Sequence, residues 1–213
     1  MTVDSDTKFW DAAAKKYSLS KVGDQAGYER TLDKTRSFLK ESDRVLELGC
    51  GTGSTALLLA PSVSRYLATD LSPKMIEIAQ EKLAKNNAIS GLEFRATTAA
   101  ALSTEASKYS TIIGFNYLHL VRDTPATMQS IRTMLEDGGL FISKTPCLGE
   151  MNPLIRWVGI PVMQVFGWAP SVGSFNTADL KRHIVSAGFD ILVDEIHSSK
   201  GNDKRPFIVA RKI

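Results

Sequence analysis

Residues in one short stretch have the types and the spacing of a nucleoside site. Glu47 is followed by three glycines at alternate positions, Gly49, Gly51 and Gly53, and Asp70 lies further along the chain. Glycines let a loop turn tightly and let its backbone approach a ligand, because no Cβ stands in the way. A carboxylate accepts hydrogen bonds from two neighbouring ribose hydroxyls. Together these residues predict a loop that cradles a nucleoside and an acid that binds its ribose.

The elements that must position these residues follow from the flanking sequence. The apolar run over residues 45–48 is typical of a buried parallel strand. A helix is expected to begin at Ser54 and to end by Pro61, and a second strand over 66–69 leads into Asp70. Strand, glycine loop, helix, strand and acid in this order predict a right-handed βαβ unit with its ligand at the carboxyl edge.

The spacing of the glycines separates this loop from the dinucleotide fingerprint. That fingerprint is G-x-G-x-x-G, whereas this chain has Gly49-Cys50-Gly51-Thr52-Gly53 after Glu47. The pattern E-x-G-x-G-x-G resembles the first motif of class I S-adenosylmethionine-dependent methyltransferases, here of the small-molecule type. The resemblance implies a Rossmann-like α/β fold: a mostly parallel seven-stranded sheet, an antiparallel strand in a C-terminal hairpin, and helices on both faces. It also implies S-adenosyl-L-methionine as the cofactor.

The resemblance further implies which residues hold the methionyl end and the ribose of the cofactor. The methionyl end is expected at Glu47 and the loop 49–53, and the ribose at Asp70. The sulfur is expected near Asn116 or Tyr17. The complete expected cofactor set is Tyr17, Glu47, Gly49, Cys50, Gly51, Gly53, Asp70, Leu71, Met75, Thr98, Ala99 and Asn116.

The adenine end of the site follows the family pattern with one departure. The segment D-L-S-P-K-M after the second strand resembles the family, in which Leu71 and Met75 flank the adenine. Met75 as plain core is an equal alternative. After a third strand over 92–96, many relatives have an acid where this chain has Thr98. Thr98 would then accept one hydrogen bond from adenine, and the Ala99 backbone would donate another.

The segment 1–40 is expected to form a helical cap. Residues 7–17 have aromatic side chains at helical spacing, and Asp24 is a good N-cap for a second helix. The F-W-D-x-x-A-x-x-Y sequence that includes Trp10 and Tyr17 resembles a family segment that folds over the cofactor. This would place Trp10 at the substrate. An amphipathic helix packed on the sheet is an equal alternative.

The end of the fourth strand, expected over 111–115, borders the reaction centre in this fold. Asn116, Tyr117 and His119 follow it, and NYLHLV resembles the corresponding segment of small-molecule enzymes. Tyr117 and His119 are therefore the candidate catalytic residues. His119 has the side-chain type of a general base. A lone histidine at a strand end is weak support for catalysis, so we favour a structural hydrogen bond for it.

Residues 145–175 are expected to form a lid-like insertion. Aromatic residues and methionines are frequent there, yet prolines and glycines interrupt it too often for a core helix. A lid over the acceptor predicts a small, partly apolar or aromatic acceptor. A membrane-contacting or dimer patch is the competing interpretation. The expected substrate-binding residues are Trp10, Trp157, Phe166 and Trp168.

The remaining elements complete the expected fold. A helix over 125–136 ends at Asp137-Gly138-Gly139, and a strand over 140–143 follows. Another helix is capped by Thr177 or Asn176. The last two strands, 191–196 and 206–211, are too close in sequence to be parallel, so they must form an antiparallel hairpin. Nicotinamide dehydrogenases lack this hairpin edge.

Composition sets the broader limits. The 213 residues fit one methyltransferase domain, 1–213, and a net charge of +3 does not argue for a nucleic-acid partner. Cys50 and Cys147 give neither a disulfide framework nor a metal-ligand spacing, which suggests the cytoplasm. No signal peptide and no membrane-spanning run is expected, whereas peripheral membrane contact and oligomeric state stay open. A dinucleotide-dependent oxidoreductase and a non-catalytic nucleoside-binding module are the alternative functions.

Overall fold

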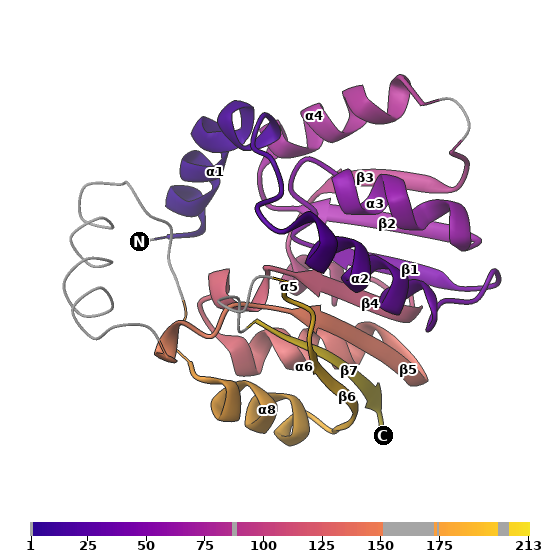
Figure 1. Cartoon of the computed structure of the whole chain (residues 1–213), viewed down its shortest axis with the longest axis vertical. Helices are drawn as coiled ribbons and strands as arrows, with labels where there is room; N and C mark the ends of the chain where they lie inside the picture. The colour runs from indigo at the N-terminus through magenta and orange to yellow at the C-terminus, as the bar shows by residue number, and fades with distance from the viewer. Residues whose placement is uncertain (1, 87–88, 151–172, 174, 200–204) are drawn as a thin grey trace.

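A central sheet organises the computed structural model, which describes residues 2–86, 89–150, 173, 175–199 and 205–213. Its seven strands lie in the order β3-β2-β1-β4-β5-β7-β6 (Figure 1). They are β1 (Arg44–Leu48), β2 (Arg65–Asp70), β3 (Leu92–Ala96), β4 (Tyr109–Phe115), β5 (Leu135–Lys144), β6 (Phe189–Ile196) and β7 (Pro206–Lys212). Strands β1 to β5 pair in parallel, whereas β7 is antiparallel to both β5 and β6. The expected mostly parallel sheet with an antiparallel C-terminal strand is confirmed.

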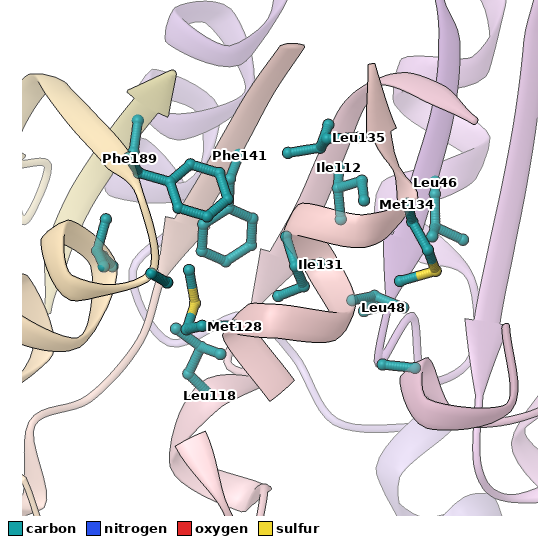
Figure 2. Packing of buried hydrophobic residues seen from close by; sticks show 14 of the residues in the cluster. Leu46, Leu48, Ile112, Leu118, Met128, Ile131, Met134, Leu135, Phe141 and Phe189 are labelled. Atoms are coloured by element: carbon teal, nitrogen blue, oxygen red, sulfur yellow. The ribbon is translucent and has the colours of Figure 1, made fainter. Parts of the chain in front are cut away.

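Helices cover both faces of the sheet because its parallel strands are apolar on both sides. One face is covered by α2 (Gln25–Arg36), α3 (Ser54–Leu59) and α4 (Pro73–Ala84), and the other by α5 (Ala99–Leu102), α6 (Thr124–Met134) and α8 (Thr177–Ser186). Along β1, Val45 belongs to the first of these two cores, and Leu46 and Leu48 belong to the second. Figure 2 shows the second core, where Met128 and Ile131 of α6 approach the sheet. Alternation of side chains along each strand thus supplies both cores.

Helix α1 (Val3–Ser18) is placed differently from the others. It lies beside α4 and beyond the carboxyl ends of the parallel strands (Figure 1). It begins earlier than the expected 7–17, because Thr2 and Ser5 form a reciprocal capping box. Asp24 caps α2 as expected, with its carboxylate accepting a hydrogen bond from the Gly27 N–H at 3.0 Å. Helix α1 therefore lies over the edge of the sheet at which the parallel strands end.

One expected boundary is wrong, and one that was left open is now assigned. Helix α6 ends at Met134 rather than at 136, and Leu135 already has extended backbone (φ −79°, ψ 142°). Its fully buried side chain belongs to the core and its backbone pairs with Tyr109, which draws the chain out of the helix. Asp137-Gly138-Gly139 then lies in an irregular start of β5. At α8, Asn176, one of the two expected residues, is the N-cap, and Asp179 completes a capping box with it.

Short 3-10 helices occupy connections along the chain. They are η1 (Ala60–Ser62), η2 (Leu118–Leu120) and η3 (Leu148–Glu150). Most of the expected lid, including Trp157, Phe166 and Trp168, lies outside the described residues. Within the described part of the chain, no helix is long and apolar enough to cross a membrane.

Candidate active site

The glycine loop between β1 and α3 is held in a backbone conformation that other residues resist. Gly51 and Gly53 have φ values of 54° and 76°. A Cβ on Gly53 would lie 2.6 Å from the Phe94 ring, and one on Gly51 would lie 3.3 Å from the Tyr17 ring. The loop therefore needs glycine both for its conformation and for space. Gly53 is buried and packs against Phe94 and Ala79.

Asp70 ends β2 and faces the loop. One carboxylate oxygen accepts the Gly51 N–H at 3.0 Å and the other accepts the Ser72 N–H at 2.9 Å. An ionised carboxylate has about four acceptor positions, so these two hydrogen bonds do not fill it. Burial raises the pKa of this carboxyl, and the backbone N–H groups of Ser72, Gly51 and Leu71 oppose that shift. Asp70 has the position and the acceptor capacity for a ribose.

Glu47 is a buried acid inside β1, with 2% of its surface exposed. One of its oxygens accepts the Tyr66 hydroxyl at 2.9 Å. Burial raises the pKa of Glu47 to about 7, although the Tyr66 hydrogen bond opposes the shift. A carboxyl with this pKa ionises readily once a cationic group approaches it. Glu47 is therefore suited to bind an amino group rather than a neutral ligand.

A first cavity of about 550 Å³ lies under α1, and its size is within the range of ~300–1,000 Å³ typical of ligand sites. Asp70 and Gly51 line it beside the loop, and Trp10 of α1 lines it from above. Most of the expected cofactor residues meet here: Tyr17, Gly49, Gly51, Asp70, Leu71, Met75, Thr98, Ala99 and Asn116. The candidate catalytic residues Tyr117 and His119 also line this cavity.

Thr98 and Met75 lie at the expected adenine end of this cavity. The Thr98 hydroxyl oxygen accepts the Ala101 N–H at 3.3 Å and so caps α5. A hydroxyl has two acceptor lone pairs, so one of them stays available for the expected hydrogen bond from adenine. Met75 is 2% exposed and also lines the cavity, so core packing and ligand contact are combined in one side chain.

A second cavity, of about 620 Å³, adjoins the first. Glu47 and Cys50 line it, together with side chains that the sequence did not single out: Lys21, Tyr28, Thr31, Lys144 and Arg205. The two cavities share a border made of Tyr17, Gly49, Phe115 and Asn116. Because Asp70 opens to the first cavity and Glu47 to the second, a ligand that binds both acids must cross this border.

The side chains after β4 lie at this border. Asn116 has a positive φ of 50°, and its amide oxygen accepts a hydrogen bond from Arg205 at 3.0 Å. The Tyr117 ring packs so closely on the loop that a Cβ on Gly49 would lie 2.7 Å from it. Burial raises the pKa of Tyr117, so its hydroxyl keeps its proton at neutral pH.

His119 is held by neutral groups. Its Nδ1 lies 3.1 Å from the Thr145 hydroxyl, and its carbonyl accepts the Gly173 N–H at 2.7 Å. Burial, with a contribution from the charge of Arg205, lowers the pKa of His119 to about 4. The imidazole is therefore neutral at pH 7 and is a weak base.

Helix α1 is fastened over the first cavity by polar contacts at two points. Arg122, which follows η2, donates two hydrogen bonds to Asp6, at 2.5 and 3.1 Å. Asp11 accepts the Ser72 hydroxyl at 2.6 Å and the Lys74 N–H at 3.1 Å, next to the start of α4. Specific polar contacts, and not apolar packing alone, thus hold α1 over the cavity.

Several of these residues were not predicted. Lys144 is at the carboxyl end of a parallel strand, so the rule that ligands bind at that edge could have indicated it. Arg205 and the Asp6–Arg122 pair have no local sequence signal. Among the described residues, no three His, Cys, Asp or Glu side chains group as they would around a metal ion.

Comparisons with known proteins identify the family of this chain. A family model described as "Methyltransferase domain" matches residues 23–192. The ubiquinone biosynthesis O-methyltransferase of Methylocella silvestris is 30% identical over 144 residues, which cover 68% of this chain and 53% of that protein. The enzyme of the same name from Chelativorans sp. is 25% identical over 190 residues, covering 81% of this chain and 72% of that protein. The chain thus spans about half the length of the first of these relatives.

Solved structures share the fold. Magnesium protoporphyrin IX methyltransferase from Synechocystis, with S-adenosylhomocysteine bound, has a TM-score of 0.71 at 18% identity and covers 98% of this chain and 95% of that chain. The [4+2]-cyclase SpnF has a TM-score of 0.75 at 15% identity, with 100% and 97% covered. A methyltransferase and a cyclase therefore share this architecture, and the likeness concerns the fold and not the reaction.

Proposed function

This chain belongs to the class I S-adenosylmethionine-dependent methyltransferases, and on that premise we propose that it methylates a small, partly apolar or aromatic acceptor. The observation that carries the proposal is the pair of acids, Asp70 and Glu47, which open to two adjoining cavities. A ribose at one acid and an amino group at the other are the two polar ends of S-adenosyl-L-methionine. The names of the curated relatives, as ubiquinone biosynthesis O-methyltransferases, support an oxygen atom as the methylated position.

The residues of the first cavity would hold the nucleoside half of the cofactor. Asp70 would accept both ribose hydroxyls, Leu71 and Met75 would contact the adenine ring, and the Ala99 backbone would bond its edge. The loop and Glu47 would hold the methionyl half on the other side of the border. When bound, the cofactor supplies a methyl group on a positively charged sulfur, already activated for transfer. The chief task of the protein is then to align the acceptor and to exclude water.

The residues at the border would orient the acceptor. Tyr117 keeps its proton, so its hydroxyl can donate a hydrogen bond to an acceptor oxygen. His119 is neutral and lies within hydrogen-bond distance of Thr145, so it would bind the acceptor rather than take up its proton. Positive charge leaves the sulfur during the transfer, so no oxyanion hole is required. An acceptor that already carries a negative oxygen would need no general base.

We also propose that residues 1–213 act as one methyltransferase domain. Helix α1 would cover the nucleoside, and 145–175 would cover the acceptor with Trp157, Phe166 and Trp168. A small-molecule acceptor, rather than a nucleic acid, agrees with the small net charge of +3.

Transfer of labelled methyl groups tests this proposal. The purified chain is incubated with methyl-labelled S-adenosyl-L-methionine and a panel of phenols, catechols and aromatic carboxylates. We expect label in at least one organic product, with one S-adenosylhomocysteine formed per methyl transferred, and no transfer by the Asp70→Ala variant. Binding of S-adenosylhomocysteine without transfer to any compound would favour the non-catalytic module, and binding of nicotinamide dinucleotides instead would favour the oxidoreductase.

A further inference from the structure

A cluster of hydroxyl side chains follows the glycine loop and lines the second cavity. Its members are Thr52, Ser54 and Thr55, and Tyr28 of α2 lines the cavity with them. The hydroxyls of Thr55 and Tyr28 lie 3.0 Å apart and hydrogen-bond to each other. The hydroxyls of Thr52 and Ser54 instead share one partner, the Lys82 side chain. The two pairs of hydroxyls are therefore held in different ways.

Lys82 reaches this cluster from the last turn of α4. Its Nζ donates to the Thr52 hydroxyl at 2.8 Å, to the Thr52 carbonyl at 2.9 Å and to the Ser54 hydroxyl at 3.2 Å. An ammonium has three donors, so these three oxygens use all of them. Burial lowers the pKa of Lys82, and no neighbouring acid among the described residues opposes this shift. Oxygen dipoles of the loop, rather than a carboxylate, therefore compensate the charge of Lys82.

The contact with Lys82 fixes the roles of both hydroxyls. An ammonium cannot accept a hydrogen bond, so the Thr52 and Ser54 oxygens must be the acceptors in these contacts. The single proton of each hydroxyl is then directed away from Lys82, where it can donate. Thr52 is 4% exposed, Ser54 is exposed, and both line the second cavity. Two hydroxyl donors therefore lie at the wall of this cavity.

The methionyl end of the cofactor needs donors in this cavity. In the proposed binding mode, Glu47, which also lines it, holds the amino group of the cofactor. The carboxylate of an amino acid is bonded to the same carbon as its amino group, so it must lie in the second cavity as well. A carboxylate left without hydrogen bonds in a partly buried site would cost free energy. Hydroxyl donors close to the loop can supply them.

We propose that the Thr52 and Ser54 hydroxyls bind the carboxylate of the cofactor and that Lys82 is a positioning residue for them. The inference rests on the proposed function, because it takes the second cavity as the place of the methionyl half. Hydrogen bonds from hydroxyls to a carboxylate are charge-assisted and therefore strong. Lys82 would make both hydroxyls donors, hold the loop through the Thr52 carbonyl, and add a positive charge behind the carboxylate.

Removal of the carboxylate alone tests the subsite. Calorimetry compares the affinity of S-adenosylhomocysteine with that of its decarboxylated analogue, S-adenosyl-3-thiopropylamine, which keeps the amino group. The wild-type chain should bind S-adenosylhomocysteine about tenfold or more tightly, as charge-assisted hydrogen bonds would allow. Thr52→Val, Ser54→Ala and Lys82→Met should each lower that preference about threefold or more without weakening the binding of the analogue. Lys82→Arg keeps the charge and several donors, so it should retain most of the preference.

A matched control is available on the same helix. Lys85 is an exposed cation at the C-cap of α4, and it lines neither cavity. Lys85→Met should therefore leave the carboxylate preference at its wild-type value. Equal weakening of both ligands in Lys82→Met would show that Lys82 only stabilises the loop, and it would overturn the role assigned to this residue.

Two further outcomes would overturn the subsite. One is equal affinity of the wild-type chain for the two ligands. The other is loss of the preference in Lys144→Met together with an unchanged preference in Thr52→Val and Ser54→Ala, because the carboxylate would then bind at the end of β5. Failure of the wild-type chain to bind either ligand would instead contradict the proposed function.

Discussion

The two cavities at the carboxyl edge of the sheet are built in different ways. Around the first, the glycine loop and Asp70 are tied by a hydrogen bond between residues 19 positions apart. Around the second, Lys144 reaches Thr31 across 113 positions, and Arg205 reaches Asn116 across 89. One site is a local βαβ unit, whereas the other is assembled from both ends of the chain.

This difference explains why the two halves of the proposed site can be expected to differ in specificity. A βαβ unit with its loop and acid forms a nucleoside site almost by itself, so its chemistry is set by a short stretch of sequence. The second cavity includes Glu47 and Cys50 of that unit, but its other walls come from α2, β5 and the residue before β7. We infer that Asp70 and the first cavity serve the nucleoside half of the cofactor, whereas Glu47 and the second cavity serve its methionyl half.

The largest expected effect tests the first half. Asp70→Ala removes a carboxylate that would accept two ribose hydroxyls, and each charge-assisted bond is worth about 1.5–3 kcal/mol. S-Adenosylhomocysteine affinity should fall about a hundredfold or more by calorimetry. Asp190→Ala, an exposed acid on β6, is the matched control. Unchanged cofactor affinity in Asp70→Ala would mean that another acid binds the ribose.

The next effect concerns Glu47 and depends on pH. Its pKa is about 7, so its ionised fraction rises between pH 5 and pH 8. S-Adenosylhomocysteine, whose amino group is cationic in this range, should bind more tightly as the pH rises, by about tenfold in total. In Glu47→Gln this pH dependence should disappear. A wild-type affinity that is flat across this range would contradict the assignment of Glu47 to the amino group.

Ionisation of Glu47 should strengthen cofactor binding as the pH rises, but it should lower the stability of the free protein. The folded pKa of about 7 lies above the ordinary value of 4.5, so the folded state holds more protons than the unfolded state between these values. Stability is therefore full below about pH 4.5 and falls as the pH rises toward 7, by roughly 3 kcal/mol. Thermal melts should show that Glu47→Gln is less sensitive to pH in this window. Equal pH dependence of stability in the wild type and in Glu47→Gln would show that ionisation of Glu47 does not destabilise the folded state.

A smaller effect is expected at the border, for His119. Its hydrogen bond to Thr145 is a neutral one, worth about 0.5–1.5 kcal/mol, so His119→Ala should lower turnover about threefold to tenfold. Because the pKa of His119 is about 4, the pH profile of turnover above pH 6 should be unchanged. A loss of a hundredfold with disappearance of a pKa near neutrality would instead establish a general base.

The smallest effect is expected for the fastening of α1. The Asp6–Arg122 pair is partly exposed, with side-chain exposures of 12% and 37%, and such pairs contribute about 1 kcal/mol or less. Arg122→Gln should weaken S-adenosylhomocysteine about threefold, mainly through faster dissociation in stopped-flow measurements. Arg182→Gln removes an ion pair within α8 and should have no effect on dissociation. Equal dissociation rates in Arg122→Gln and the wild-type protein would show that α1 does not retain the ligand.

The contrast between the cavities also explains what could be predicted from the sequence. The loop, Asp70 and the antiparallel C-terminal hairpin follow from short-range patterns and from the rule that close C-terminal strands pair antiparallel. The cations of the second cavity could not be found in that way, because their proximity depends on the pairing of β5 with β7. The expected end of α6 was wrong for a related reason. Leu135 is apolar and fits the helical pattern, but its backbone pairs with Tyr109 in the sheet and its side chain is buried in the core.

Calorimetric titration of the wild-type chain with S-adenosylhomocysteine and with oxidised nicotinamide adenine dinucleotide tests the central claim most directly. A site with the ribose at Asp70 and the amino group at Glu47 predicts one S-adenosylhomocysteine bound per chain, with affinity that rises from pH 5 to pH 8. It predicts no measurable heat with the dinucleotide. Binding of the dinucleotide and not of S-adenosylhomocysteine would contradict the assignment of both cavities.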